Sequence, residues 1–530
     1  MKNNHQKSIR RFITVGITSS ILLTPAIPLL TNLTSTALAS TTYLFPGRAE
    51  DLQSGEYWYR RKEIHGTGSQ KLGYDLTAIR FDNRSKNWTT DKPGTDGSKN
   101  EHKLIYGQPV YAVTSGKVIK CWRNAPDNPA PGKSHPGRTS NPKTIYGGGN
   151  HLTVDVGNGE LILYAHLKPG SIPQSLCPIS QQFVTDASND SERTLPPAQQ
   201  VTLKAGQFIG NVGNGGSSSG PHLHIHKSKG NTPLSLPFAS VWTKSIETNQ
   251  DSDKDWKRLT NQGLPPGKIA ILPDFSKGNK EIARHGIPAS EYQFVFDQIT
   301  KSGYRLEWID GFSVNGKIYF NALFHPNNGI EWTSFHNLTS SQYQAKFNQY
   351  TKAGYRPTQI ESYLNGNTVL YAAIFVKENG SSFTAYHGLS ADEHQKRIDD
   401  LTKNGWRPKN ISVVSINGNR SYAALYEKTN IGSFVAKSFL TSAQYQQLFN
   451  ENQQQGRQIA YLNAYQHNGQ TRFTAIWNSV TQGTFKARHD LSSQQYQNEW
   501  ESAQNSSLLT RNVTGYVDGN SVRYAGVWRK

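Results

Sequence analysis

The sequence has very few cysteines, and this limits the kinds of metal site it can build. Its two cysteines are Cys121 and Cys177, and neither has a close cysteine partner along the chain. A zinc site made of cysteines is therefore excluded, and any metal must be held by histidine and carboxylate side chains. In an oxidising compartment, the two cysteines are expected to form one disulfide.

Long apolar runs are also scarce, and the one at residues 12–30 has the features of a bacterial secretory signal. Four basic residues precede it, and the small-residue segment Ala-Leu-Ala at 37–39 follows it. This order predicts cleavage after residue 39, and two prolines inside the run argue against a retained anchor. Since no equally long apolar run follows, the mature chain is predicted to be secreted and to have no membrane contact.

Acidic residues are outnumbered by basic ones. The formal net charge is +19 over 530 residues, and removal of the four basic residues of the signal leaves +15. Because Lys and Arg are scattered, nucleic acid is a poor partner for such an exported protein, and an anionic cell-wall polymer is a better one. A chain of this length is expected to form two or more domains.

Helical periodicity is hard to find between residues 43 and 245, so this part is predicted to be mainly β. Short apolar segments alternate there with Gly, Pro and Asn, as in an extracellular β domain. Three long loops are expected at residues 82–104, 123–149 and 168–200. Loops of this length often line functional clefts. We assign residues 40–245 to one domain and residues 246–266 to a linker.

Residues 267–530 are predicted to form five tandem repeats with a period of 51 residues. Tyr or His followed by Gln recurs at that spacing, with an apolar residue four positions later, which predicts one amphipathic helix per repeat. The first members of these pairs are Tyr292, Tyr343, His394, Tyr445 and Tyr496. Each helix is expected to end at a residue in the left-handed conformation, at Gly303, Gly354, Gly405, Gly456 and Ser507.

An Asn-Gly or Asp-Gly pair then predicts a hairpin in every repeat, so each unit combines one helix with about three antiparallel strands. The next strand carries an aromatic residue, at Phe320, Tyr371, Tyr422, Phe473 and Tyr524. These rings are interpreted as core residues, and neighbouring repeats must stack to bury them. The array resembles the bacterial tandem repeat found beside the catalytic domain of polyglycine hydrolases. This α+β array is expected to support or target the first domain.

Five residues of the first domain form a candidate zinc site: His65, Asp75, His166, His222 and His224. His222 and His224 follow a Gly-Pro turn and are two positions apart at the start of a predicted strand. Alternate residues of a strand share a face, so both rings can point into one cleft. A catalytic zinc needs three protein ligands and an open position, which leaves one of the two rings free to transfer protons.

The segments around these residues resemble the lysostaphin-type and β-lytic zinc metallopeptidases. Residues 210–225 read GNVGNGGSSSGPHLHI, and residues 164–167 read YAHL. The resemblance covers about residues 60–230. It implies a small antiparallel β fold with an open groove and hydrolysis of the peptide stems or cross-bridges of peptidoglycan. It also implies a zinc ion held by two histidines and one aspartate.

Carried over by motif, His224 and Asp75 are metal ligands, and His166 and His222 are catalytic residues beside the metal. The remaining ligand is the uncertain one, because the lysostaphin-type pattern has a histidine where this chain has Lys71. The β-lytic pattern places its histidine further upstream, and His65 resembles that arrangement. A protonated lysine has no lone pair for zinc, so His65 is predicted to be the third ligand.

Two further histidines follow family-like segments. His226 lies on the same predicted face as His222 and His224, where the family usually has an acidic residue. It is expected to be a rim residue rather than a support for a ligand. His151 is expected to be structural.

Two other functions stay open at this point. The first is a degenerate peptidase without metal that binds wall peptides or activates another hydrolase, and Lys71 is the residue that suggests it. The second is an adhesin-like protein in which the repeats do the main work. Retention of the other site residues favours the active zinc endopeptidase.

Overall fold

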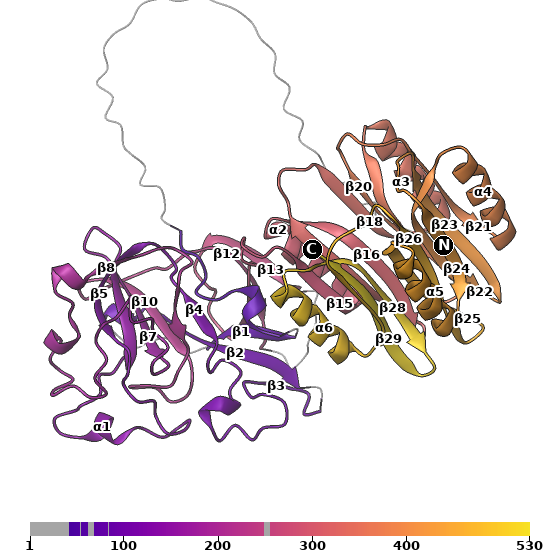
Figure 1. Ribbon diagram of the computed structural model, residues 1–530. Coiled ribbons are helices and arrows are strands. Elements are labelled where there is room, and N and C mark those ends of the chain that lie inside the picture. Colours follow the sequence, from indigo (N-terminus) through magenta and orange to yellow (C-terminus); the bar gives the residue numbers. More distant parts are fainter. Residues whose placement is uncertain (1–41, 54, 62–67, 83, 248–254) are drawn as a thin grey trace, which may run out of the picture. The chain divides into compact units, whose positions relative to one another are not determined.

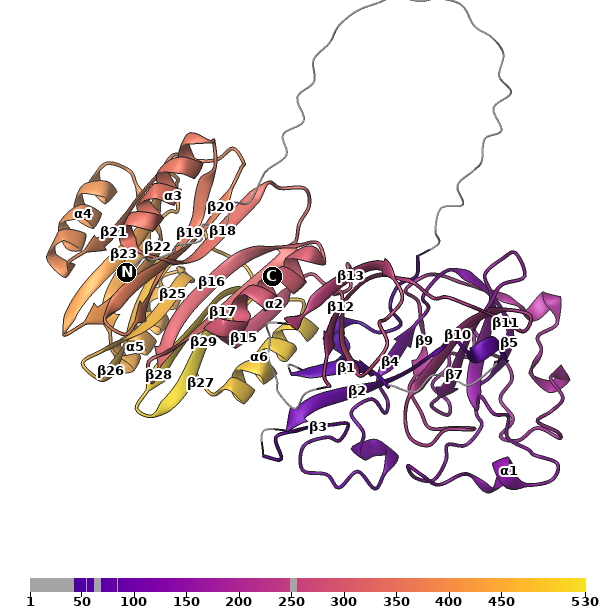
Figure 2. The ribbon, with the colours of Figure 1, turned by 180° about the vertical axis from the view of Figure 1, so that it is seen from behind.

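The computed structural model describes residues 42–53, 55–61, 68–82, 84–247 and 255–530 (Figures 1 and 2). The chain divides into two units, residues 1–41 and 42–530, and the first unit lies outside the described residues, as does the predicted secretory signal. Within the described part, no helix is long and apolar enough to cross a membrane.

The described residues of the N-terminal half form a large antiparallel sheet whose strands differ in length. This confirms the prediction that this half is mainly β. Its order is β13-β12-β14-β1-β2-β10-β7-β6-β5-β8, with β3 paired to β2 and β11 paired to β10. The strands are β1 (Glu56–Arg60), β2 (Tyr74–Asp82), β3 (Asn87–Thr89), β5 (Gly116–Trp122), β6 (Asn150–Asp155), β7 (Leu161–Leu167), β8 (Val201–Leu203), β10 (Leu223–Lys229), β11 (Thr232–Leu234), β12 (Phe238–Ser245), β13 (Lys257–Gln262) and β14 (Ile269–Pro273).

Shorter elements complete this half of the chain. A two-stranded sheet pairs β4 with β9, and the long loops contain one short α-helix and several 3-10 turns. Their bounds are β4 (Pro109–Tyr111), β9 (Phe208–Asn211), α1 (Pro136–Thr139), η1 (Ala49–Asp51), η2 (Gly68–Gln70), η3 (Asn100–His102), η4 (Ser191–Arg193) and η5 (Pro197–Gln199).

The middle of the large sheet is the best buried part of this fold. Most residues of β10 and β7 are buried, and their apolar side chains join one core with Trp58, Leu76 and Val118. At the other end, β13 and β14 pair with β12. The predicted linker, residues 246–266, therefore contains a strand of this sheet, and the domain boundaries remain a prediction.

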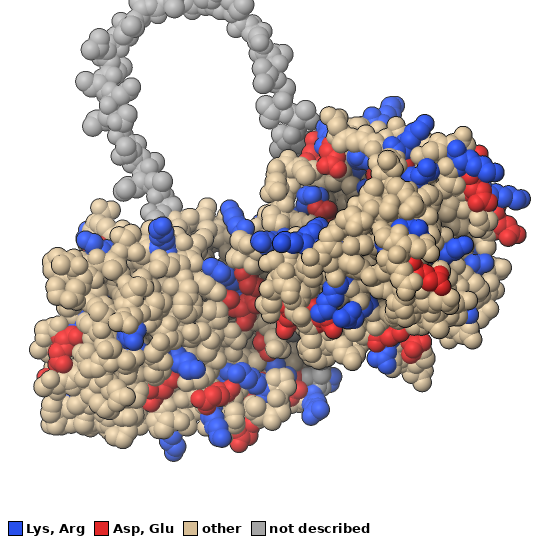
Figure 3. All heavy atoms as spheres, in the orientation of Figure 1, with Lys and Arg blue, Asp and Glu red and all other residues tan. Residues whose placement is uncertain are grey.

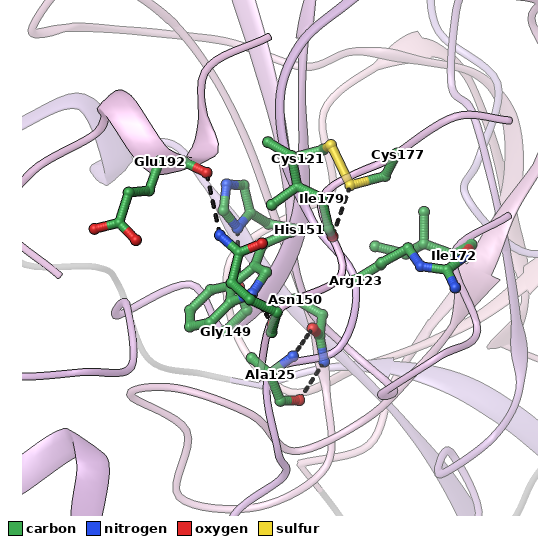
Figure 4. Close-up of a disulfide and its surroundings, with 12 residues drawn as sticks. Cys121, Arg123, Ala125, Gly149, Asn150, His151, Ile172, Cys177, Ile179 and Glu192 are labelled. Carbon is green, nitrogen blue, oxygen red and sulfur yellow. Dashed lines mark hydrogen bonds between the residues drawn. A yellow bond between two sulfur atoms is a disulfide. The ribbon is translucent and has the colours of Figure 1, made fainter. Parts of the chain in front are cut away.

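The predicted disulfide between Cys121 and Cys177 is confirmed. The two Cα atoms are 5.7 Å apart, and the bridge joins the end of β5 to the loop that follows β7. Figure 4 shows His151 and Asn150 beside it. The Asn150 side chain holds the same region together through hydrogen bonds to both backbone groups of Ala125. The disulfide therefore fixes the long loop after β7 against the end of β5.

We expect the disulfide to stabilise the N-terminal half strongly. It closes a loop across 56 residues of sequence, and loop-closure entropy for that length corresponds to about 4 kcal/mol. Replacing both cysteines with alanine should lower the first calorimetric unfolding transition by several degrees, and denatured, unreduced wild-type protein should contain no free thiol. Two free thiols in that titration, or equal transitions for the two proteins, would contradict the assignment.

Each repeat contains one helix and one three-stranded antiparallel sheet, which confirms the predicted unit. The helices are α2 (Ala289–Lys301), α3 (Ser340–Lys352), α4 (Ala391–Lys403), α5 (Ser442–Gln454) and α6 (Ser493–Asn505). The sheets are β15 (Ile282–Pro288), β17 (Lys317–Pro326) and β16 (Tyr304–Val314); β18 (Trp332–Leu338), β20 (Thr368–Val376) and β19 (Arg356–Asn365); β21 (Phe383–Leu389), β23 (Asn419–Glu427) and β22 (Arg407–Ile416); β24 (Phe434–Leu440), β26 (Gln470–Asn478) and β25 (Gln458–His467); β27 (Phe485–Leu491), β29 (Ser521–Arg529) and β28 (Leu509–Asp518).

Local signals explain why the units are so regular. The last four helices begin with a Ser or Thr side chain that accepts a backbone hydrogen bond, answered by Glu or Gln three residues later. The residues predicted to close the helices do have positive φ, from 99° at Gly303 to 56° at Ser507. The recurring strand aromatics are buried, as predicted.

The five sheets close into a ring, which the sequence did not predict. The strands β16, β19, β22, β25 and β28 follow one another, and β28 again lies beside β16 (Figure 1). Side chains join adjacent strands: the Gln359 amide bonds both backbone groups of Ile309, and Trp308 Nε1 donates to the Val513 carbonyl across the closing contact. The repeats thus form a five-bladed propeller with these strands innermost.

Candidate metal centre

The centre of the site is a carboxylate and an imidazole on neighbouring strands. Asp75 lies on β2 and His224 on β10, and the antiparallel register places them directly opposite each other. Side chains of directly opposed residues project to the same face. Accordingly, Asp75 Oδ1 is 2.9 Å from His224 Nδ1. The sheet itself therefore brings together the two side chains that the sequence predicts as metal ligands.

His222 points at the same carboxylate from the turn before β10. The ring is buried, and its Nδ1 lies 2.8 Å from the carbonyl oxygen of Gly220. Because a carbonyl can only accept, Nδ1 carries the proton, and Nε2 of the neutral ring has a free lone pair. That Nε2 lies 3.4 Å from Asp75 Oδ1. His222 is thus close to the centre with its basic nitrogen directed toward it.

His166 completes the group from the end of β7. Its ring centroid is 4.6 Å from that of His222 and 6.0 Å from that of His224. Its Nδ1 donates to the carbonyl of Gly215 at 2.7 Å, which again leaves Nε2 as the basic nitrogen. Burial, reinforced by the neighbouring imidazoles, holds the pKa of His166 well below its usual range. This ring is therefore neutral near pH 7.

The backbone of His166 is also unusual. Its φ is +64°, in the left-handed region that residues with a Cβ rarely occupy. Hydrogen bonds hold it there, since its N–H donates to Gly148 and its carbonyl accepts from Gly213. Such conformations cost about 1–3 kcal/mol and cluster at functional sites. The chain thus keeps a costly conformation at the position that directs this ring toward His222.

The prediction that His226 lies at the rim is wrong. Its ring is buried, and its Nδ1 lies 2.8 Å from Nε2 of His224. A Cβ at Gly73 would be 2.9 Å from the Cβ of His226, so the backbone of that turn closes over it. Alternation along β10 puts both histidines on one face, and burial of the strand keeps His226 from solvent. His226 therefore orients His224 through a hydrogen bond.

We expect the His226→Phe variant, which keeps an aromatic ring but loses both nitrogens, to bind zinc about 10–100-fold more weakly. The reason is that His224 would lose the partner of its Nε2. Competition with a chromogenic chelator measures the affinity, and His151→Phe, which alters a buried histidine away from the group, is the control. Equal affinities for the wild type and His226→Phe would show that the contact does not orient the ligand.

The turn before β10 is held by polar residues that the sequence did not indicate. Ser218 Oγ lies 3.2 Å from His222 Nδ1 and donates to Asn214 Oδ1 at 2.7 Å. The side chain of Asn128 donates to the carbonyls of Gly216 and Ser218, at 3.1 and 3.0 Å. Asn128 lies about ninety residues earlier in a long loop, so nothing in its local sequence indicated this role.

Steric crowding explains why this turn contains glycine. Gly216 has a φ of +75°, and a Cβ there would lie 2.3 Å from the carbonyl oxygen of Gly147. The neighbouring Gly215 supplies the carbonyl that fixes the proton of His166. Close approach of two backbone segments thus makes glycine necessary at position 216, in the segment that holds the rings of His166 and His222.

Two donor atoms among the described residues, Asp75 Oδ1 and His224 Nδ1, are of the types that zinc accepts. If His224 donates through Nε2 to His226, its Nδ1 lone pair and the Asp75 carboxylate face each other, as two ligands of one metal do. Among the described residues, no group of three or more His, Cys, Asp or Glu side chains is arranged to hold a metal. His65, the predicted third ligand, lies outside the described residues, and Lys71 is exposed in a turn.

Charge on the surface is dispersed. On the face drawn in Figure 3, Lys and Arg stand among neutral and acidic side chains and do not gather into one patch. The basic net charge of the sequence therefore has no single focus on this face, in agreement with its scattered distribution along the chain.

Comparison with protein families identifies the C-terminal repeats. The family model described as "Polyglycine hydrolase-like, structural repeat" matches five segments, residues 278–327, 329–378, 380–429, 432–480 and 482–530. These segments coincide with the five helix-and-sheet units. The tandem repeats are therefore polyglycine hydrolase-like structural repeats.

Among solved structures, similar chains are peptidase domains. A mutant of the catalytic domain of the prophage-encoded M23 protein EnpA from Enterococcus faecalis is 21% identical, with a TM-score of 0.12, over 28% of this chain and 85% of that one. A zinc-containing peptidase from Vibrio cholerae is 18% identical, with a TM-score of 0.15, over 31% of this chain and half of that one.

Proposed function

We propose that the N-terminal domain is a zinc endopeptidase that hydrolyses peptide bonds of bacterial peptidoglycan. The observation that carries this proposal is the cross-strand contact between Asp75 and His224, with the rings of His222 and His166 directed at the same place. Two candidate ligands beside two imidazoles are components that metal-assisted hydrolysis uses.

The ligands in this proposal are Asp75 and His224, together with His65. When bound, zinc supplies Lewis acidity, which lowers the pKa of a bound water and polarises a carbonyl. The chain does the rest of the positioning: the β2–β10 register fixes the separation of the two described ligands, and His226 fixes the rotation of the His224 ring. A hydrogen-bonded second residue of this kind raises the basicity of a metal-binding imidazole.

The catalytic residues in this proposal are His166 and His222, which handle protons. Each ring donates through Nδ1 to a backbone carbonyl, so Nε2 is the nitrogen that can accept a proton. One of them takes the proton of the attacking water, and its protonated form can then donate to the leaving amine. The other can bind the oxyanion that develops on the carbonyl oxygen when its Nε2 is protonated, because only an N–H group can donate to that oxygen.

The substrate in this proposal is a peptide stem or cross-bridge of peptidoglycan, and the protein acts outside the cell. Residues 1–39 are the proposed secretory signal. The disulfide between Cys121 and Cys177 supports an oxidising compartment. The strongly basic composition suits a wall that contains anionic polymers. The repeats then support or target the enzyme.

The decisive experiment is digestion of purified peptidoglycans that differ in their cross-bridges by the full mature chain. Loaded with zinc, the protein should release peptide fragments whose new termini identify the bond. Chelation should stop the release and added zinc should restore it. Protein that takes up no zinc, binds the wall and produces no new termini would instead favour the degenerate, metal-free binder or the adhesin.

A further inference from the structure

The axis of the propeller is lined by a ring of buried polar side chains. They occupy equivalent positions, 51 residues apart, on the five innermost strands, and all are almost completely inaccessible to solvent. The members of this axial ring are Asp310, Glu361, Ser412, Asn463 and Thr514. An adjoining cavity of about 100 Å³ is bordered by innermost strands of all five repeats and reaches the ring at Asn463.

Four members of the axial ring share one structural task. Each accepts a hydrogen bond from the backbone N–H that follows the equivalent position in the preceding repeat. Ser412 Oγ accepts from Ser362 at 2.9 Å, and Asp310 Oδ2 accepts from Gly515 at 2.9 Å, which closes the ring from the fifth repeat to the first. Asn463 and Thr514 accept in the same way, at 3.3 and 3.2 Å. Short polar side chains are sufficient for this bond.

Glu361 departs from the pattern. Its Oε1 accepts from Ser412 Oγ at 3.0 Å and from Asn463 Nδ2 at 3.5 Å, so its longer side chain reaches toward the third and fourth repeats. Its Oε2 is buried and has no hydrogen-bond partner among the described residues. Burial and the charges of Glu361 and Asp310 raise the pKa of the nearby Tyr461 hydroxyl.

Two carboxyl groups thus lie close together in a buried place. Burial raises the pKa of Asp310 to about 7, and burial together with the charge of Asp310 raises the pKa of Glu361 well above its usual range. No Lys, Arg or His of the described residues lies close enough to offset either charge. A pair of uncompensated charges in such a place is very costly, so the ring requires either protons or a cation.

We propose that the axial ring binds one divalent cation, Ca²⁺, between Asp310 and Glu361. Two carboxylates balance its charge, and the unpartnered Glu361 Oε2 supplies an available ligand. The hydroxyl oxygens of Ser412 and Thr514 add neutral ligands. Ca²⁺ accepts six to eight oxygens in flexible geometry, whereas Mg²⁺ demands a near-octahedral shell rich in water. The ring offers oxygen but no imidazole or thiolate, which excludes the donor sets that zinc and copper prefer.

The test uses the full mature chain, saturated with zinc so that the histidine site is filled. Tb³⁺, a luminescent substitute for Ca²⁺, is titrated while tyrosine and tryptophan are excited. Tyr461 and Trp308, whose ring centroids are 5.8 Å from each other, lie beside the axial ring and can transfer the excitation. We expect one saturable site per chain that Ca²⁺ displaces, and a melting temperature of the repeats that rises with Ca²⁺.

The variant Glu361→Gln, which keeps the shape and removes the charge, should bind Tb³⁺ more than about tenfold more weakly, because affinity follows the number of charged ligands. The control is Glu331→Gln, which removes an exposed carboxylate from the same repeat and should bind as the wild type does. If Glu361→Gln does not fold, Ser412→Ala should still weaken binding several-fold. The proposal is overturned if the wild type shows no sensitised emission and no effect of Ca²⁺ on melting. It is equally overturned if the folded Glu361 or Ser412 variant binds like the control.

Discussion

Replacing His166 or His222 with alanine should abolish hydrolysis while zinc stays bound. Both rings face the centre, yet each is fixed by a backbone carbonyl through Nδ1 and is proposed to handle protons rather than to hold metal. Loss of a positioned base or acid typically costs about 10²–10⁴ in rate, and loss of an oxyanion donor costs a similar factor. Fragment release from peptidoglycan gives the rate, and metal analysis of the purified variants gives the zinc content.

The matched variants are His224→Ala and Asp75→Ala, which should lose zinc and activity together. All four residues lie within one small group, so general damage to the fold would affect both pairs alike. The proposed roles predict that zinc content and hydrolysis are lost together in His224→Ala and Asp75→Ala, whereas only hydrolysis is lost in His166→Ala and His222→Ala. Loss of zinc in His166→Ala, or retention of zinc in His224→Ala, would mean that the roles are misassigned.

Replacing His65 with alanine should remove zinc, whereas replacing Lys71 should not. Two ligands hold a catalytic zinc weakly, and a neutral imidazole is the usual third. Lys71 is exposed, and a lysine ammonium group has no lone pair to offer a metal. We expect the zinc affinity of His65→Ala to fall by more than about 100-fold, beyond the effect of losing a supporting residue.

Lys71→Ala is the control for this prediction, since it changes the position where the lysostaphin-type pattern has its ligand. It should keep zinc and fragment release. His65→Gln keeps a polar side chain at the other position and should behave like His65→Ala. Full zinc and activity in His65→Ala would contradict the ligand assignment. Loss of both in Lys71→Ala alone would mean that Lys71, and not His65, supports the metal.

The repeats were the easiest part to predict from sequence. Their helices, closing residues and hairpins are local features, each with a signal within a few residues, and fivefold repetition makes chance agreement improbable. Closure of the ring was not predictable in this way. It depends on a contact between the first and the last repeat, such as that of Trp308 with Val513, and local periodicity contains no information about it.

The candidate site also depends on contacts between distant parts of the chain, which local sequence signals do not predict. The contact between Asp75 and His224 follows from a register between strands about 150 residues apart, and only the motif resemblance predicted it. His226 was misplaced because alternation along a strand predicts the face of a residue but not its depth. Depth depends on β2, β7 and the turn at Gly73, which cover this part of β10.

Closure of the propeller constrains how such a chain can change its length. In an open array, a terminal repeat has one neighbour and can be lost at the cost of one interface. Here, each of the five repeats has two neighbours, because β28 lies beside β16. Deleting one would break two interfaces and leave a gap one blade wide. Moving the start of the array by one repeat would preserve every interface, so circular permutation is the sequence rearrangement that this architecture tolerates best.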